Sequence, residues 1–297
     1  MSSQIYGGIE AGGTKFMCAA GTGPEDVRGW ERIETRSPGE TLRDVVRFFR
    51  EHPVAGLGIG SFGPLDLDPA SPGYGRITTT PKADWRDTAL VQPLREALGV
   101  PVTLDTDVNA AALGEWTWGA GRGARNLIYL TVGTGIGGGA IADGKLLHGM
   151  THPEMGHLLP PHDPARDPFP GCCPYHGDCW EGLASGEAMR QRWDRPAEDL
   201  PPDHEGWDLE ADYLAAGVMS LMMTLSPERV VVGGGVAAAP GLLATVRERL
   251  AGRLNGYGAF PDTIEGLNGF IVPPGLGNRS GVLGALALAM RQDAPSG

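Results

Sequence analysis

Cysteine and histidine gather in one short part of this 297-residue chain. Residues 152–179, HPEMGHLLPPHDPARDPFPGCCPYHGDC, contain three of the four cysteines and four of the seven histidines. Cys173, His176 and Cys179 follow one another at two-residue gaps, and His157 lies sixteen residues before Cys173. Two thiolates and two imidazoles suit a closed tetrahedral Zn²⁺ site, because short gaps let consecutive ligands curl around one ion. A disulfide and a chance cluster are the alternatives, and we favour zinc.

The other residues of this kind receive simpler interpretations. Cys172 is expected to be a neighbour that does not bind the metal, although an exchange of Cys172 for Cys173 stays open. Three further histidines are expected to be structural or solvent-exposed: His148, His152 and His162.

Three glycine clusters, each after a predicted strand, could hold phosphate: EAGGTK (10–15), GTGIGGG (133–139) and GGGVA (233–237). Without a Cβ, the backbone N–H groups can approach phosphate oxygens closely, although a single such cluster is more often structural. Gly133, Gly135 and Gly138 have dinucleotide-binding spacing, but a hairpin is expected to follow where that motif needs a helix. The P-loop pattern is absent, since Lys15 follows Thr14. The sequence therefore predicts phosphate held by hairpin turns.

A carboxylate suited to proton transfer lies at the start of an alanine-rich predicted helix. Asp107, in DTDVNAAAL, directly precedes that helix, which either Thr106 or Asp107 could cap. Backbone N–H groups and the positive end of the helix dipole favour an ionised carboxylate there. Such a group could accept the proton of a hydroxyl that attacks a phosphoryl group. An ordinary helix cap is the alternative interpretation.

These residues are distributed over a chain that alternates strands and helices. Strands are expected at 55–64, 102–105, 127–132 and 229–235, hairpins at 4–20 and 140–147, and helices at 41–52, 108–119, 186–225, 241–254 and 280–292. A strand, a glycine loop and a hairpin occur twice, near residues 5–20 and 127–147. This repetition indicates two α/β lobes of related design, and one large sheet domain with insertions is the alternative.

The composition describes a globular acidic chain, with 41% hydrophobic residues, 20% charged residues and a net charge of −12. A chain of this length can bury a large core. Its charge argues against binding to duplex nucleic acid, and no apolar run approaches the ~20 residues of a membrane helix. The first residues, MSSQIYGG, lack the features of an export signal, so we expect a cytoplasmic protein with reduced thiols.

Six motifs in one order resemble the ROK family of sugar kinases, and within it are most similar to the fructokinases: EAGGTKF, TDVNAAALGE, TVGTGIGGG, HPEMGH, CPYHGDC and VVVGGGV. The resemblance runs from residue 7 to about residue 287. It implies an actin-like (ribonuclease H-like) α/β fold of two lobes, with ATP and sugar meeting in the interlobe cleft, and a homodimer. The expected lobes are 1–117, completed by a C-terminal helix at about 280–297, and 118–279, which contains the zinc-binding loop.

The resemblance also implies roles for particular residues. Asp107 matches the catalytic base, and Thr106 stands where many relatives have asparagine, with a hydroxyl that can donate one hydrogen bond to a sugar. The sugar-binding positions match Glu154, His157, Glu181, Ser61 and Gly63. The ATP-binding positions match Gly12, Gly13, Thr14 and Lys15 in the first hairpin, Thr134 and Gly135 in the second, and Gly233, Gly234 and Gly235 beside the adenosine.

Mg²⁺ is implied as a further cofactor. Glu10 stands where aspartate is usual in the wider actin-like group, and its longer side chain could reach a Mg²⁺-bound water. The His157, Cys173, His176, Cys179 set resembles that of the fructokinase-like branch. One ring nitrogen of His157 would bind zinc and the other would face the sugar, so the ion is expected to be structural and to shape the sugar pocket.

The expected function is ATP-dependent phosphorylation of a hexose at its 6-hydroxyl, with fructose as the favoured substrate. Glucose, mannose or an N-acetylhexosamine are the alternative substrates. A sugar-responsive transcriptional regulator is disfavoured, because the phosphate hairpin begins at Ile5 and leaves no room for an N-terminal helix-turn-helix. A non-catalytic sugar sensor is disfavoured because neither the base nor the ATP loops are lost.

Overall fold

The computed structural model describes residues 4–80 and 82–291, which form two compact units. The first unit takes in the described parts of 1–122, 146–153 and 275–297, and the second takes in 123–145 and 154–274. The first unit therefore includes a segment, 146–153, which the sequence-based boundary leaves to the second lobe.

The first unit is built on a five-stranded sheet with the strand order β3-β2-β1-β4-β7. Its strands are β1 (Tyr6–Ala11), β2 (Lys15–Gly23), β3 (Asp26–Glu34), β4 (Leu57–Ser61) and β7 (Val102–Thr106), with a separate ribbon of β5 (Leu65–Asp66) and β6 (Arg76–Ile77). Its helices are α1 (Pro38–Glu51), α2 (Val91–Leu98), α3 (Asp107–Thr117) and α9 (Ser280–Arg291), with the 3₁₀ turns η1 (Ala83–Trp85) and η4 (Gly277–Arg279).

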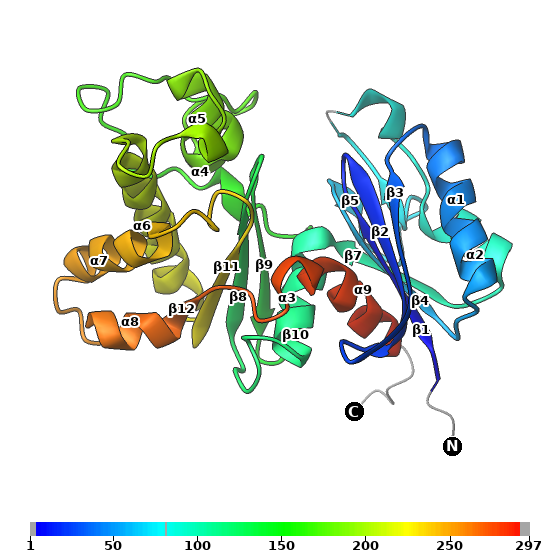
Figure 1. Ribbon diagram of the computed structural model, residues 1–297. Coiled ribbons are helices and arrows are strands. Elements are labelled where there is room, and N and C mark those ends of the chain that lie inside the picture. Colours follow the sequence, from blue (N-terminus) through cyan, green and yellow to red (C-terminus); the bar gives the residue numbers. More distant parts are fainter. Residues whose placement is uncertain (1–3, 81, 292–297) are drawn as a thin grey trace. The chain divides into compact units, whose positions relative to one another are not determined.

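Helices cover both faces of this sheet. Successive residues of β1 point to opposite faces. A Cβ on Gly7 would meet Phe49 of α1, whereas a Cβ on Gly8 would meet the backbone of α9 at Val282. α1 therefore covers one face and α9 the other, as Figure 1 shows.

The parallel strands β1, β4 and β7 end together at one edge of the sheet. Their register pairs Ala11 with Ser61, and Ser61 with Thr106. The β1–β2 turn and Asp107, the first residue of α3, consequently start from the same edge. This is the edge at which ligands bind in open α/β sheets.

Helix α3, which begins with Asp107, packs directly on α9. The two backbones approach so closely that a Cβ on Gly284 would lie 1.6 Å from the carbonyl oxygen of Ala110. A Cβ on Gly114 would lie 2.6 Å from the carbonyl oxygen of Ser280. Small residues on both helices are therefore required for α3 to lie where it does.

The second unit repeats this sheet, with the strand order β10-β9-β8-β11-β12. Its strands are β8 (Leu127–Val132), β9 (Ile136–Ala142), β10 (Lys145–Leu146), β11 (Arg229–Gly233) and β12 (Ile271–Val272). Its helices are α4 (Trp180–Ala184), α5 (Gly186–Trp193), α6 (Gly206–Leu225), α7 (Leu242–Leu254) and α8 (Ile264–Phe270), with the 3₁₀ turns η2 (Met155–His157) and η3 (Ala197–Asp199). In each sheet, three strands that follow one another in the chain lie side by side, and the first two of them form an antiparallel hairpin. Two strands parallel to the first one complete the sheet on its other side, so the predicted repetition is confirmed.

Three sequence expectations need correction. The glycine loop expected at 133–139 is wrong in its second half, because residues 137–139 pair with β8 as part of β9 and only 133–135 form the turn. The strand β3 was not expected, since its residues alternate poorly between buried and exposed. The helical stretch expected at 186–225 is interrupted between α5 and α6.

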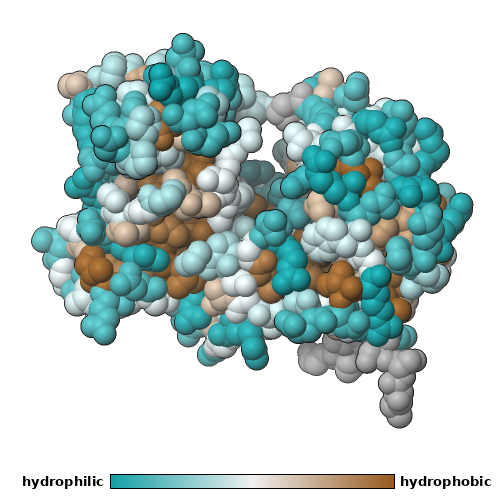
Figure 2. Space-filling model, in the orientation of Figure 1, coloured by the Kyte–Doolittle hydropathy of each residue, from teal (hydrophilic) through white to brown (hydrophobic). Residues whose placement is uncertain are grey.

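The face drawn in Figure 2 is largely hydrophilic, with hydrophobic residues in separate patches, in agreement with the acidic composition. None of the helices that the structure describes has the length and apolar character needed to cross a membrane.

The α3–α9 contact predicts a large difference between two Gly→Ala substitutions in helices. Gly284→Ala would force α3 and α9 apart and lower the free energy of unfolding by more than about 3 kcal/mol. Gly252→Ala in α7 meets no atom within 4 Å and should raise it by up to about 1 kcal/mol through helix propensity. Urea denaturation of the two variants measures both changes, and equal effects would contradict the tight packing.

Candidate functional site

Asp107 lies at the sheet edge where α3 begins. Thr106, and not Asp107, is the N-cap, because its hydroxyl oxygen accepts the N–H of Asn109 at 3.1 Å. The Thr106 hydroxyl hydrogen can still be donated. An Asp107 Oδ1 atom accepts the N–H of Val108 at 2.9 Å. The capping role is thus filled by the neighbouring residue, and Asp107 has capacity for another partner.

The surroundings of Asp107 raise the pKa of its carboxyl group. Its side chain keeps some solvent exposure, yet dense protein around it raises its pKa above the ordinary value through desolvation. Backbone N–H groups and the nearby His152 oppose this rise. The carboxyl is consequently a stronger proton acceptor than an exposed aspartate.

Glu10, at the end of β1, is the second carboxyl in this region. Burial, and then repulsion from Asp107, raises the pKa of Glu10 to about 7, while Lys15 and a hydrogen bond from the Val282 backbone oppose the rise. Its side chain lies against the first turn of α9, where a Cβ on Gly281 would come within 2.5 Å of it. Each carboxyl thus lies at the N-terminus of a helix, where the dipole favours negative charge.

A third carboxyl, Asp105, is buried and forms hydrogen bonds through both of its oxygens. Its Oδ1 atom accepts from the Asn109 side chain at 2.9 Å, and its Oδ2 atom lies 2.9 Å from His148 Nε2. The hydrogen bond to Asp105 raises the pKa of His148. His148, which the sequence indicated only as structural or exposed, is half-exposed and forms this contact with Asp105.

The end of β4 and the loop that follows it are held by hydrogen bonds within the first unit. Ser61 is fully buried and its hydroxyl donates to the carbonyl oxygen of Phe62 at 2.9 Å. His152 Nε2 accepts the N–H of Leu65 at 3.2 Å, which confirms a structural role for this histidine. Gly63 lies beside the His152 ring and stays partly exposed.

In the second unit, two of the three glycine clusters border one cavity. The cavity has a volume of about 920 Å³. Gly133 and Thr134 of the β8–β9 turn lie at its lining together with Gly235, which follows β11. The strand register explains this, because Thr131 of β8 pairs with Gly233 of β11, so both loops leave the same edge. A cavity of this size suits a nucleotide.

Other residues of this lining had no signal in the sequence. They come from α5, η3 and the residue after it, the start of α6 and the segment after β11: Arg190, Ala197, Leu200, Trp207 and Ala239. The apolar side chains among them suit a planar base, and only the fold brings them together.

Glu181 connects the β8–β9 turn to the cysteine-rich loop. Its Oε2 atom accepts the N–H of Ile136 at 3.0 Å, and a Cβ on Gly135 would lie 2.5 Å from this atom. Gly135 is therefore needed for this contact. Glu154 is exposed, and its carbonyl oxygen accepts the N–H of His157 at 3.1 Å.

The four residues predicted to bind metal come together. One possible ligand atom from each of His157, Cys173, His176 and Cys179 lies within 4.8 Å of all the others. His157 Nδ1 lies 3.4 Å from Cys179 Sγ and 3.8 Å from Cys173 Sγ, and His176 Nδ1 lies 3.7 Å from Cys173 Sγ. Cys172 is outside this group, and all four cysteines of the chain are free thiols.

These separations fit a tetrahedral ion. With bonds of about 2.3 Å to sulfur and about 2.05 Å to nitrogen, tetrahedral ligands lie about 3.6 Å apart. Burial raises the pKa of Cys179 to about 11, so a thiolate at this position requires a cation close by. The donor set and its spacing therefore fit Zn²⁺, bound through His157 Nδ1, with His157 Nε2 on the opposite side of the ring.

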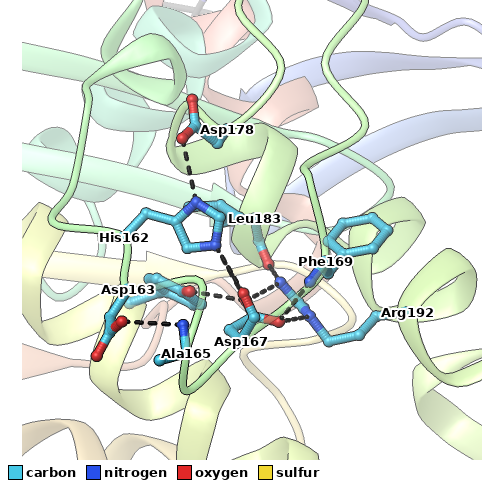
Figure 3. Close-up of polar contacts among 9 residues, drawn as sticks. His162, Asp163, Ala165, Asp167, Phe169, Asp178, Leu183 and Arg192 are labelled. Atoms are coloured by element: carbon cyan, nitrogen blue, oxygen red, sulfur yellow. Dashed lines mark hydrogen bonds and ion pairs between the residues drawn. The ribbon is translucent and has the colours of Figure 1, made fainter.

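A buried ion pair anchors the loop that contains these ligands (Figure 3). The Asp167 carboxylate accepts from Arg192 Nε at 3.1 Å and from Nη2 at 2.9 Å, and both side chains are almost fully buried. Tyr213 donates to the same carboxylate at 2.7 Å. His162 lies between the Asp167 carbonyl oxygen at 3.0 Å and the Asp178 carboxylate at 3.1 Å, which confirms a structural role for it.

The fold and these clusters define a class of protein before any relative is considered: two α/β units of one design, with glycine turns at the edges where open α/β sheets commonly bind ligands. The ROK family profile matches residues 6–292. The fructokinase of Zymomonas mobilis is 47% identical over 97% of each chain, and that of Pediococcus pentosaceus is 42% identical over 96% of this chain and 97% of its own. A crystal structure of a ROK family glucokinase from Streptomyces griseus in complex with glucose and AMPPNP has a TM-score of 0.77 and 26% identity, over 97% of this chain and 99% of its own.

The chain belongs to the ROK family. Its fold is the actin-like two-lobe α/β fold that the sequence predicted.

The raised pKa of Glu10 predicts a pH-dependent effect of Glu10→Gln on stability. The folded protein binds this proton up to about pH 7, whereas the unfolded chain releases it near the ordinary value of 4.5. Above pH 4.5, burial of Glu10 therefore lowers the free energy of unfolding, and this destabilisation reaches its full size above about pH 7. Without nucleotide or added cation, Glu10→Gln should raise the melting temperature clearly at about pH 8 and little at about pH 5. A gain of equal size at both pH values would contradict the assigned cause.

Proposed function

We propose that this chain is an ATP-dependent hexose kinase that transfers phosphate to the 6-hydroxyl of fructose. The observation that carries the proposal is the desolvated carboxyl of Asp107, which starts from the same sheet edge as the β1–β2 turn. A base is most effective when its pKa lies near the working pH, and desolvation moves Asp107 in that direction. The fructokinase relatives support fructose as the substrate.

Each group then has a defined task. Asp107 accepts the proton of the attacking hydroxyl, and the Thr106 hydroxyl donates to the sugar. Glu154, His157 and Glu181 bind further hydroxyls, since a carboxylate can accept several hydrogen bonds from a polyol. The turns at Gly12–Lys15 and Thr134–Gly135 bind the ATP phosphates, and Gly233–Gly235 border the adenosine. Of these three glycines, Gly235 lies at the lining of the cavity of about 920 Å³. ATP supplies the phosphoryl group, and Mg²⁺ is proposed as its counterion.

Initial rates with ATP and a panel of fructose, glucose, mannose and N-acetylglucosamine test the proposal. We expect the highest kcat/KM with fructose and fructose 6-phosphate as the product. Asp107→Asn should lower kcat by about 10²- to 10⁴-fold with an unchanged fold, because the amide cannot accept the proton. Preference for another hexose would select one of the alternative substrates. Full activity of Asp107→Asn would remove this residue from the role of base.

We further propose that the cluster of His157, Cys173, His176 and Cys179 holds a structural Zn²⁺. Glu154 precedes His157 by one turn of η2, and Glu181 lies two residues after Cys179 in α4. One ion therefore orders both segments that contain the proposed sugar-binding carboxylates. His157 Nε2 is left to meet the substrate.

The zinc proposal predicts a selective loss of sugar binding. Cys173→Ser should lose bound zinc and fructose affinity while nucleotide affinity is kept, because the nucleotide cavity is lined by other residues. Cys172→Ser is the matched control and should keep the metal. Metal analysis and calorimetric titration with fructose and with ATP measure these quantities. Normal phosphorylation of fructose by zinc-free protein would overturn the role.

A homodimer and a cytoplasmic location, both expected from the sequence, stay predictions. Sedimentation analysis at several protein concentrations tests the first.

A further inference from the structure

Lysine is rare in this chain, and two of the three lysines lie at one turn. The chain has 24 lysines and arginines, and three of these residues are lysines: Lys15, Lys82 and Lys145. Lys15 begins β2, directly after the β1–β2 turn. Lys82 is distant in sequence, yet its ammonium group donates to the carbonyl oxygen of Gly13 in the middle of that turn.

The carbonyl oxygens of Gly12, Gly13 and Thr14 in the turn all accept hydrogen bonds from residues of the first unit. Thr35 holds two of them, since its hydroxyl donates to the Gly12 oxygen at 2.8 Å and its N–H donates to the Thr14 oxygen at 3.0 Å. Lys82 holds the carbonyl of Gly13 that lies between them. The N–H of Gly12 is also used, by the Lys15 oxygen at 2.9 Å.

The central N–H groups of the turn are left for a ligand. In a trans peptide the C=O and the N–H point in opposite directions, so the bond from Lys82 to the Gly13 oxygen also sets the direction of the Thr14 N–H. No residue in the described part of the chain accepts a hydrogen bond from the N–H of Gly13 or Thr14. A Cβ on Gly13 would meet nothing within 4 Å, so the space beside it is open. Successive backbone N–H groups of this kind form an anion-binding concavity.

Lys82 is held in place by a buried aromatic anchor. Its carbonyl oxygen accepts the N–H of Trp85 at 2.9 Å, and Trp85 is fully buried. The Trp85 indole donates to the Arg36 carbonyl oxygen at 2.9 Å, and its ring lies 5.2 Å from that of Phe16 in β2. The base of the Lys82 side chain is therefore fixed relative to the hairpin, while the side chain itself is only half-buried.

We propose that Lys82 is a phosphate-binding residue of the β1–β2 turn, which adds a second cation to Lys15. An ammonium group has three donors, so Lys82 can keep its bond to Gly13 and donate to a phosphate oxygen as well. The inference rests on the proposed ATP-dependent activity and deepens it. A purely structural tie between a half-exposed lysine and one carbonyl is the competing explanation, and it predicts no response of Lys82 to ATP.

The small number of lysines allows a direct test on the wild-type protein. Lysines are acetylated with an amine-reactive ester, with and without ATP, and the modified peptides are quantified by mass spectrometry. We expect ATP to protect Lys15 and Lys82 and to leave Lys145 unchanged, because Lys145 is exposed at the β9–β10 turn of the second unit. AMP, which lacks the β- and γ-phosphates, should protect neither lysine at the first turn. Equal labelling of Lys82 with and without ATP overturns the inference.

Substitution supplies the kinetic test. Lys82→Met should lower kcat/KM for ATP by about 10- to 100-fold, the loss expected for one hydrogen bond to a charged group, with unchanged AMP affinity and melting temperature. Lys82→Arg should recover part of this loss, and Lys145→Met should behave as wild type. Wild-type kinetics of Lys82→Met overturn the inference. The inference is also overturned if kcat/KM for ATP falls, Lys82→Arg does not recover it, and AMP affinity and stability fall to the same extent. Absence of hexose phosphorylation by the wild-type protein would instead refute the proposed function.

Discussion

The position of the poorly solvated carboxyl of Asp107 depends on the packing of the first unit. Asp107 is the first residue of α3, so its position depends on where α3 begins and how deeply α3 lies on the sheet. That depth is set by residues without side chains, since a Cβ on Gly60 would come within 2.5 Å of Ala110 and a Cβ on Gly284 would enter the same turn of α3. The desolvation that raises the pKa of Asp107 is thus a consequence of small residues packed beneath it.

The two hairpin turns that are proposed to bind phosphate share one feature, since carbonyl oxygens of both turns accept hydrogen bonds from elsewhere in the chain. In the β1–β2 turn, Thr35 and Lys82 engage the carbonyl groups. In the β8–β9 turn, the first N–H groups of α5 do so, because Gly186 donates to the Gly133 oxygen at 2.7 Å and Glu187 donates to the Thr134 oxygen at 3.2 Å. A turn whose oxygens are occupied presents less negative charge to a phosphate, and this feature supports the proposal that a hairpin takes the place of the helix N-terminus used by other nucleotide sites.

The parts of the site that the sequence predicted depend on short-range patterns. Thr106 and Asp107 could be placed at a helix start from the alanine-rich segment behind them, and the cluster of four proposed metal ligands could be predicted from their spacing. Residue pairs distant in sequence could not be predicted, because nothing local in either partner indicates the other. Asp105 with His148, and Lys82 with Gly13, are of this kind.

The error at 133–139 has the same origin. A run of glycines is typical of a loop, but Gly138 pairs with Leu130 as part of β9, and a Cβ there would come within 2.6 Å of Met155 Sδ, which belongs to the following 3₁₀ turn. The sequence shows that bulk is absent from this position and does not show which neighbour excludes it. A glycine needed for close packing and a glycine needed for a turn are therefore indistinguishable until the tertiary contact is known.

The cysteine-rich loop shows why a metal cluster alone is insufficient to position a site. Four ligands on one ion fix their own side chains, but the segment between His157 and Cys173 is long and has no regular secondary structure. The ion pair of Asp167 with Arg192 fixes the middle of this segment to α5 and is buried, so removal of either partner leaves an uncompensated charge. His162 then links Asp167 to Asp178, the residue directly before Cys179. The proposed metal ligands and the buried ion pair therefore hold the segment between Glu154 and Glu181 at different points.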